Sequence, residues 1–377
     1  MNRTVLIFSP GNDVHARAVA DRITEISGGY VSPVYVDGAT FPVSSTIETK
    51  CGGIGGDQLE LAEALPEVYS PQKPARFLNP VVSIDMDSVI GIWWRRFRSP
   101  VPAKSLGESK GRGSVPDYAV RSTQQTIKGL VLGASSRVTL INDPFLEDRA
   151  NVKPYQLKAA EQAGLLVAPT LISNRPDSIL RFVRHHWDAG HDVVYKSVAS
   201  NQLVAFTQQL KEADLEKLSA ASHCPTIFQR RVPGFDVRIA VTASRMFALG
   251  EHSSEVDVRL DNNSTYLPYE LSQENERLIR RLHQILGLTF ASYDFKCDAE
   301  GRLWFLEVNP SGQWLWLEVE GGFPLSAVVA SMLIGKSEYG DWSPYTDSDF
   351  ERFCPDMTEN AMHAAYERAV AASTAAE

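Results

Sequence analysis

The chain has 377 residues, enough for two or three domains with buried cores, and its composition is ordinary for a globular protein. Its net charge of −9 argues against nucleic acid or an anionic membrane as a partner. The N-terminal apolar run is too short for a signal peptide, and no apolar run is long enough to span a bilayer. The four cysteines lie far apart without CxxC spacing, which indicates reduced thiols in a cytoplasmic protein.

The N-terminal segment alternates strand and helix patterns. Residues 3–9 form an apolar run typical of a buried strand, and a helix pattern follows, with Asn12 or Asp13 as its N-cap and Gly28 at its end. A second strand pattern covers residues 30–37. The order strand–helix–strand predicts a parallel sheet. The first strand–helix turn lacks the glycine fingerprint of dinucleotide-binding enzymes, which argues against hydride transfer.

A further strand ends in Trp93-Trp94-Arg95-Arg96. Ligands of open α/β sheets bind at the carboxyl ends of strands, so these arginines are ligand candidates, and a solvated strand end is the equal alternative. Residues 99–116 are rich in Gly, Ser, Pro and Lys, which indicates a linker and a first domain boundary.

Two lysines occupy positions suited to phosphate binding. Residues 151–164 form a helix pattern with Asn151 as the expected N-cap and Gly164 at the end. Lys153 lies at the helix start, where a cation opposes the macrodipole, and a costly placement hints at function. Lys196 ends an apolar strand before a polar loop, where it can hold phosphates as a point charge. The alternative for Lys153 is a solvated helix lysine.

The central region predicts a strand over residues 226–232 and a hairpin over 233–254. Asp236 and Arg238 share one strand face, and the pair Asp257 and Arg259 repeats this spacing. One such pair is often a surface salt bridge of little energetic value. Two such pairs on neighbouring strands indicate function more strongly if they lie beside a metal site, and the next segment of the chain predicts one.

The segment 288–316 reads as two strands joined by a short turn. With the turn centred on residues 299 and 300, we expect Asp294 opposite Phe305 and diagonal to Glu307, at most about 7–8 Å away. Glu307 and Asn309 then share one face. We expect the other face to be apolar and to carry Trp304, Leu306 and Val308.

Carboxylate and amide oxygens on one strand face are the hard donors that Mg²⁺ prefers. Acidic residues on a strand usually face solvent, which is the alternative explanation here. Carboxylates in so apolar a stretch are costly unless they are paired or bound to metal. The sequence therefore predicts a metal site formed by Asp294, Glu307 and Asn309.

The pattern D-F-x-x-D-x-x-G-x-x-x-F-L-E-V-N-P, which begins at Asp294, resembles the metal-binding signature of the ATP-grasp superfamily. Its continuation S-G-Q-W-L-W-L-E resembles the branch of ribosomal peptide maturases that make graspetides such as microviridins. The runs R-A-x-x-K-x-x-Q-L from Arg149 and G-x-D-x-R from Gly234 extend the resemblance over most of the chain.

The resemblance implies an α/β (α+β) ATP-grasp fold. Its expected parts are an N-terminal Rossmann-like parallel-sheet domain (1–116), a central lid domain (117–226), a C-terminal antiparallel-sheet domain with the metal site (227–345) and a helical tail (346–377). It also implies ATP and Mg²⁺ as cofactors. The implied activity is phosphorylation of Asp or Glu side chains in a precursor peptide, followed by condensation with Ser/Thr hydroxyls or a Lys amine to close ω-ester or ω-amide rings.

The resemblance also implies residue roles. Arginine binds carboxylates bidentately, so an arginine pair suits the acceptor acid. The implied roles are ATP phosphate contacts for Lys153 and Lys196, adenine contacts at Gln229, Arg230 and Val232, nucleotide-site proximity for Asp236, transferred-phosphate contact for Arg238, acceptor-carboxylate binding by Arg259 with Arg238, and metal binding by Asp294, Glu307 and Asn309.

The implied partners are a precursor peptide and a second copy of this chain in a homodimer. A leader helix of the precursor is expected to dock on the hairpin region 237–254, with an apolar seat formed by Phe235, Met246 and Phe247. Two alternatives stay open. One is an ATP-grasp ligase that joins a free amino acid to a peptide or small acid, and the other is a degenerate fold that only binds nucleotide or peptide.

Overall fold

The computed structural model describes residues 3–41, 45–49, 56–62, 81–101, 113–198, 207–252, 265–338, 340–346 and 348–349. The described chain groups into two compact units. The first comprises Met1–Phe145 and Gln313–Cys354, and the second contains Leu146–Gly312. The domain boundaries predicted after residues 116, 226 and 345 stay predictions. The predicted tail helix, most of the predicted linker and the loop after Lys196 lie outside the described residues.

A parallel sheet forms the centre of the first unit. Its strands are β1 (Arg3–Phe8), β2 (Val31–Tyr35), β6 (Val89–Trp94) and β7 (Thr139–Ile141), in the order β2-β1-β6-β7. All neighbouring strands run parallel, which confirms the prediction from the strand–helix–strand pattern. The helix between the first two strands, α1 (Val14–Ser27), begins after Asp13, whose side chain accepts hydrogen bonds from the backbone N–H groups of His15 and Ala16.

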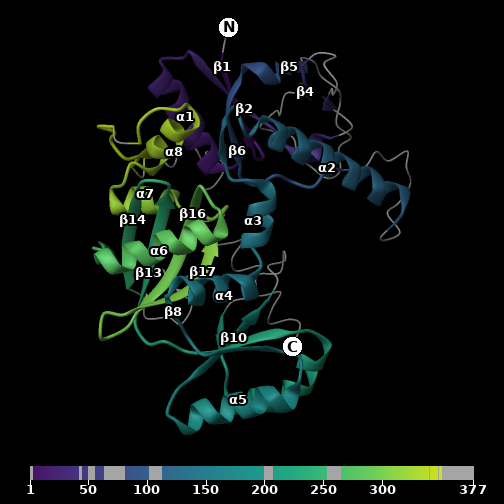
Figure 1. The fold of residues 1–377 in the computed structure, drawn as a ribbon. Helices are drawn as coiled ribbons and strands as arrows, with labels where there is room; N and C mark the ends of the chain where they lie inside the picture. The colour runs from purple at the N-terminus through teal and green to yellow at the C-terminus, as the bar shows by residue number, and fades with distance from the viewer. Residues whose placement is uncertain are drawn as a thin grey trace. The chain divides into compact units, whose positions relative to one another are not determined.

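Helices and a small antiparallel sheet complete the first unit. They are α2 (Val115–Ala134), α7 (Leu315–Gly321), α8 (Leu325–Leu333), the short 3₁₀ helices η1 (Gly38–Thr40) and η2 (Met86–Ser88), and the strands β3 (Thr46–Glu48), β4 (Gln58–Ala62) and β5 (Val81–Asp85). Every residue of α8 is buried, and α8 lies beside α1 (Figure 1). Gly91 of β6 permits close packing, since a Cβ there would stand 2.1 Å from the carbonyl oxygen of Leu333.

The second unit contains two sheets. The smaller one is antiparallel, in the order β11-β10-β12-β9, with strands β9 (Thr170–Ser173), β10 (Val193–Ser197), β11 (Gln208–Gln209) and β12 (Thr226–Arg230). Helix α5 (Pro176–Asp188) and the 3₁₀ helix η4 (Glu212–His223) pack on it. Their shared core includes Ile179, Val183, Leu218 and Phe228.

The larger sheet has six strands in the order β15-β14-β13-β16-β17-β8. They are β13 (Phe235–Thr242), β14 (Met246–His252), β15 (Thr265–Pro268), β16 (Phe290–Cys297), β17 (Leu303–Asn309) and β8 (Leu166–Val167). All pairs are antiparallel except that of β17 with β8. The predicted hairpin over residues 233–254 is therefore confirmed as β13 and β14.

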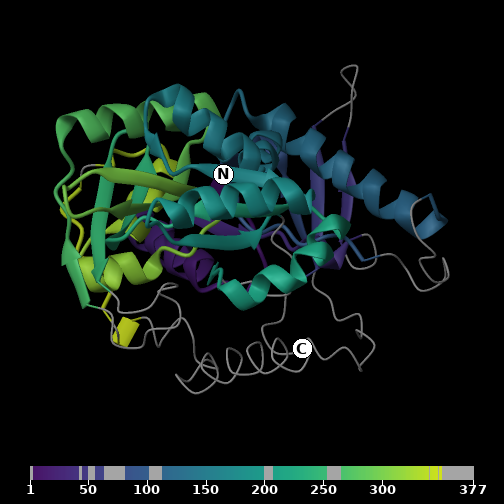
Figure 2. The ribbon, with the colours of Figure 1, turned by 90° about the horizontal axis from the view of Figure 1, so that it is seen from below.

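Helices α4 (Lys153–Ala163) and α6 (Gln273–Leu286) cover one face of this sheet, and α3 (Pro144–Ala150) precedes α4. Both views show α6 along the sheet (Figure 1, Figure 2). The apolar side of α6, with Ile279, Leu282 and Leu286, packs on strand residues such as Ile239 and Phe295. The opposite sheet face carries polar residues such as Arg238 and Asp294 beside buried apolar ones such as Leu249 and Phe247.

The prediction that Asn151 caps α4 was wrong. The backbone N–H of Asn151 donates to the carbonyl oxygen of Glu147, so this residue still belongs to the last turn of α3. The N-cap of α4 is Val152, which makes no side-chain capping bond, and Lys153 is the first helical residue. Gly164 ends the helix in the left-handed conformation, as predicted. Within the described residues, no helix has the length and apolar character needed to cross a membrane.

Candidate active site

Asp294 on β16 lies directly opposite Glu307 on β17. The expected register, with Asp294 opposite Phe305, was wrong in two steps. Phe305 pairs with Phe295, one residue from the expected position, and the pairing then shifts by a further residue between Phe295 and Asp294. One extra residue in β17 therefore lies between Phe305 and Glu307, as in a β-bulge. Because of this extra residue, Phe305 and Glu307 lie on opposite sheet faces although they are two residues apart, and Phe305 is fully buried in the core.

The prediction that Trp304, Leu306 and Val308 share one apolar face was partly wrong. Trp304 pairs with Lys296, whereas Phe305 and Val308 are core residues. Because paired residues of neighbouring strands share a face, Trp304 lies on the face of Lys296 and not with Val308. Among the three residues expected on the apolar face, Val308 is confirmed in the core.

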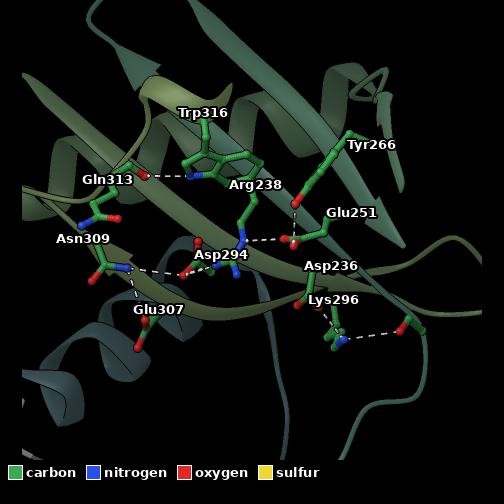
Figure 3. Close-up of polar contacts among 11 residues, drawn as sticks. Asp236, Arg238, Glu251, Tyr266, Asp294, Lys296, Glu307, Asn309, Gln313 and Trp316 are labelled. Atoms are coloured by element: carbon green, nitrogen blue, oxygen red, sulfur yellow. Dashed lines mark hydrogen bonds and ion pairs between the residues drawn. The ribbon is translucent and has the colours of Figure 1, made fainter. Parts of the chain in front are cut away.

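The three predicted metal ligands lie together (Figure 3). The side-chain nitrogen of Asn309 is 3.3 Å from Oδ2 of Asp294 and 3.2 Å from Oε1 of Glu307. Two carboxylates and one amide oxygen form a hard donor set that fits Mg²⁺ with water and phosphate at its remaining positions. Among the described residues, no group of three His, Cys, Asp or Glu side chains is placed to hold a metal. A role for Asp294, Glu307 and Asn309 as metal ligands stays a prediction.

Cationic side chains flank both carboxylates. Nζ of Lys153 lies 3.2 Å from Oε2 of Glu307, and a guanidinium nitrogen of Arg238 lies 2.6 Å from Oδ2 of Asp294. Lys196, at the end of β10, is close enough to act electrostatically on Glu307. The structure thus gathers two lysines and one arginine, all predicted from the sequence, around the carboxylate pair.

The two carboxylates have opposite tendencies to bind a proton. Burial alone would raise the pKa of Glu307, but Lys153 and Lys196 outweigh it and lower the pKa to about 2. Burial raises the pKa of Asp294, and the charge of Glu307 adds to this rise, while Arg238 opposes it. Glu307 is therefore the stronger anionic partner for a cation at this position.

A second row of charged residues lies one step along the same sheet face (Figure 3). Nζ of Lys296 lies 2.7 Å from Oδ2 of Asp236, and Nε of Arg238 lies 3.4 Å from Oε2 of Glu251. The hydroxyl of Tyr266 lies 3.4 Å from the other oxygen of Glu251. Arg238 therefore joins the row of Glu251 to the row of Asp294.

Sequence reasoning missed Glu251, Lys296 and Tyr266. Glu251 is buried, and burial raises its pKa, which Asp236 raises further and Arg238 lowers. The signal for Glu251 was a single carboxylate directly after the apolar run 246–250. Tyr266 shows no comparable signal, because its place beside Glu251 depends on the pairing of β14 with β15.

The residues predicted near adenine lie on β12 and just after it. The buried side chain of Gln229 donates to Oγ1 of Thr170 at 2.8 Å, so its amide nitrogen is engaged within the sheet. The guanidinium of Arg230 lies 5.1 Å from the ring centre of Trp304, and Val232 is buried. An adenine contact by these residues stays a prediction.

The remaining predictions concern the arginine expected to bind the acceptor carboxylate and the apolar seat expected for the leader. Arg259 and Asp257 lie outside the described residues. In the expected leader seat, Phe247 is buried with 6% exposure, so the prediction that it offers a surface was wrong. Phe235 and Met246 are half-buried, and the ring of Phe235 stacks on His252 with centroids 4.2 Å apart.

In the first unit, Arg95 is a buried cation paired with Asp13. Its Nε donates to Oδ1 of Asp13 at 3.0 Å, and 1% of the side chain is exposed, so the solvated strand end is wrong for this arginine. Nε2 of His15 accepts a hydrogen bond from the backbone N–H of Trp314 at 2.9 Å. Arg96 is partly exposed and lies 3.9 Å from Asp13.

Comparison with known proteins gives structural relatives. No family model matches the sequence, and no curated protein matches it either. The fold is similar to macrocyclase MdnC of Microcystis aeruginosa, solved with the precursor peptide MdnA, at 24% identity and a TM-score of 0.71 over 88% of this chain and 99% of that chain.

Two further relatives have comparable similarity. The RiPP-associated ATP-grasp ligase of Chryseobacterium gregarium, solved with ADP and a leader and core peptide, is 21% identical with a TM-score of 0.67, over 89% of this chain and 98% of that chain. The ATP-grasp ligase PsnB, solved with a phosphomimetic precursor variant, Mg and ADP, is 23% identical with a TM-score of 0.66, over 89% of this chain and 99% of that chain. The protein therefore has the ATP-grasp fold.

Proposed function

We propose that this protein is an ATP-dependent peptide macrocyclase of the ribosomal peptide maturase branch of ATP-grasp ligases. The observation that carries the proposal is the carboxylate pair Asp294–Glu307 with Asn309, flanked by Lys153 and Arg238 on one sheet face. The fold that it shares with peptide-bound macrocyclases and ligases supports the peptide as the substrate class.

Asp294, Glu307 and Asn309 would hold Mg²⁺. When bound, the metal would neutralise charge on the phosphates of ATP. A carboxylate is a poor nucleophile towards ATP because both are anions. Lys153 and Lys196, which already act on Glu307, would reduce this repulsion, and Arg238 would stabilise charge on the transferred phosphoryl group. The product is an acyl phosphate on an Asp or Glu side chain of the precursor.

In the second step a Ser or Thr hydroxyl, or a Lys amine, attacks the carbonyl carbon of the acyl phosphate. The new C–O or C–N bond closes the ring, the bond from carbon to the phosphate oxygen breaks, and inorganic phosphate leaves. The attacking group must lose a proton. Glu251 is our candidate acceptor, because it is buried beside Arg238 and is not a proposed metal ligand.

The precursor would be bound outside this reaction centre as well. We propose that its leader docks on the β13–β14 hairpin, where Phe235 and Met246 are half-buried apolar residues. Arg259 is proposed to hold the acceptor carboxylate together with Arg238. A homodimer is also part of the proposal, on the resemblance of the sequence alone.

The test is the intact mass of a candidate precursor peptide after incubation with the protein, ATP and Mg²⁺. We expect a loss of about 18 Da per ring, one water for each condensation, with ADP formed. A precursor whose acidic core residues are changed to amides is the matched control and should keep its mass. A gain of one amino-acid residue mass would support the free-amino-acid ligase instead. Unchanged mass without ADP formation would support a binding-only protein.

A further inference from the structure

Gln156 lies on α4, one turn after Lys153, and only 3% of it is exposed. Its side-chain nitrogen donates to the carbonyl oxygen of Val308 at 2.8 Å and to that of Ala150 at 2.7 Å. Its side-chain oxygen accepts from the backbone N–H of Val308 at 3.2 Å. Both amide hydrogens and the amide oxygen are therefore used, each with the main chain.

Val308 is the residue between the two proposed ligands Glu307 and Asn309. Beyond the bulge, the described part of the chain gives β17 no strand partner at Val308 on the β8 edge, since the pairing with β8 covers Trp304 and Phe305. A buried main-chain donor and acceptor must still be paired there. The amide of Gln156 pairs with both and so takes the place of a neighbouring strand at this single residue.

We propose that Gln156 is the positioning residue that sets the register between Lys153 on α4 and the ligand pair Glu307 and Asn309 on β17. Lys153 precedes Gln156 by three residues, so the two side chains lie on the same side of the helix. Fixing Gln156 to Val308 fixes the helix start against the strand and holds Nζ of Lys153 at 3.2 Å from Glu307. The hydrogen bond from Gln156 to Ala150 also holds the residues just before α4 in place against this helix.

This inference rests on the proposed function, because it assumes a metal–nucleotide site at Glu307 and Asn309. It predicts a specific defect. Loss of the Gln156 amide should displace the ligands relative to Lys153 and weaken the Mg²⁺-dependent part of nucleotide binding. Outer groups that orient ligands typically change metal affinity roughly 10- to 100-fold when they are removed. If Gln156 served only in folding, its loss would lower the stability of the protein without selectively weakening Mg²⁺-dependent nucleotide binding.

The experiment measures ADP affinity by calorimetry with saturating Mg²⁺ and with EDTA, and compares the ratio of the two affinities. The variants are Gln156→Met, which loses all three hydrogen bonds, and Gln156→Glu, which loses both donated bonds. The control is Leu157→Ala, a core lesion at the next residue of the same helix, for which no bond to β17 is lost. We expect the ratio to fall roughly 10- to 100-fold in the Gln156 variants and to stay unchanged in the control.

The assignment is overturned if folded Gln156 variants keep the wild-type ratio, or if Leu157→Ala lowers the ratio equally at a comparable loss of melting temperature. A second measurement needs no variant: hydrogen exchange of the Val308 amide in the wild-type protein should be slow. Exchange as fast as at a solvated strand edge would also overturn it. A wild-type protein that binds no ADP would overturn the proposed function and this inference together, whereas normal wild-type binding with a failed variant test overturns the inference alone.

Discussion

Asp294 and Glu307 face each other directly across β16 and β17 because β17 contains one more residue than its partner at this point. Without the extra residue, the pairing of Phe295 with Phe305 would continue with Leu306 opposite Asp294, and Glu307 would point to the other sheet face. Directly opposed residues have Cβ atoms about 4.5–5.5 Å apart. The bulge therefore brings two like charges together, and Lys153 and Arg238 offset the repulsion from either side. A bulge in this role re-aims side chains at a site.

Glu307→Gln tests the metal assignment. The amide keeps the shape of the side chain but loses the negative charge that attracts Lys153 and Lys196 and would attract a metal cation. We expect ATP-dependent ligation, measured by product mass, to fall by about 10²- to 10³-fold or to be abolished, while the melting temperature stays close to that of the wild type.

Glu300→Gln is the matched control for this change. Glu300 is an exposed carboxylate in the turn of the same hairpin, paired with Arg302, and its loss should leave ligation unchanged. Full ligation by Glu307→Gln would contradict the metal assignment.

Glu251→Gln tests proton transfer to Glu251. The groups around Glu251 are the charged Arg238 and Asp236 on β13 and the neutral hydroxyl of Tyr266 on β15. Burial has the largest influence and raises the pKa of Glu251. A base acts when it is deprotonated, so wild-type ester formation should fall as the pH drops through this raised pKa. In the variant, the rate of ester formation should no longer fall over this pH range, and it should be about 10²- to 10⁴-fold lower than in the wild type.

Trapping with hydroxylamine separates the two half-reactions of that test. Hydroxylamine captures the acyl phosphate without help from the proposed base, so its rate of capture should be equal in the wild type and in Glu251→Gln. Equal loss of trapping and of ester formation would mean that Glu251 supports phosphorylation instead.

His15 should make the first unit sensitive to acid. Burial and the Arg95 guanidinium lower the pKa of His15 to about 3, against the opposing effect of Asp13, and a protonated Nε2 cannot accept from Trp314. The unfolded chain binds the proton below about pH 6.5, so stability falls with pH from there towards 3. Between pH 6.5 and 4.5 we expect a loss of about 2 to 3 kcal/mol in the free energy of unfolding.

Urea unfolding at several pH values measures this loss. In His15→Gln the side-chain oxygen can still accept from Trp314, but the group no longer titrates, so the slope in this pH window should be smaller. A variant with the wild-type slope would show that other groups cause the acid sensitivity.

Two glycines of the first unit should respond to alanine in opposite directions. A Cβ at Gly91 would stand 2.1 Å from the carbonyl oxygen of Leu333, whereas at Gly133 in α2 nothing lies within 4 Å. Gly91→Ala should lower the free energy of unfolding by about 1 to 3 kcal/mol or more, because backbone must move. Gly133→Ala should raise it by about 0.5 to 1 kcal/mol. Calorimetric melting of both variants checks the pair, and equal melting temperatures would contradict the packing of α8 on β6.

Local patterns in the sequence were sufficient for much of the fold. The strand–helix–strand opening, the hairpin at residues 233–254 and the helix end at Gly164 all follow from hydrophobic period and capping residues within one element. The residue types at 294, 307 and 309 also pointed to a cation site, because hard oxygen donors in an apolar stretch need a partner. Such features depend on neighbours in sequence, which a single chain displays directly.

Tertiary structure decided what depends on partners far away in sequence. The extra residue at Leu306 is invisible without the partner strand, and it puts Glu307 opposite Asp294, on the other sheet face from Phe305. Gln156 looked like any polar helix residue until its amide was seen to pair with Val308, 152 residues away. The ion pair between Glu251 and Arg238 likewise depends on the pairing of β14 with β13. Residue chemistry is local, but the energy of a buried polar group is set by whatever the fold brings next to it.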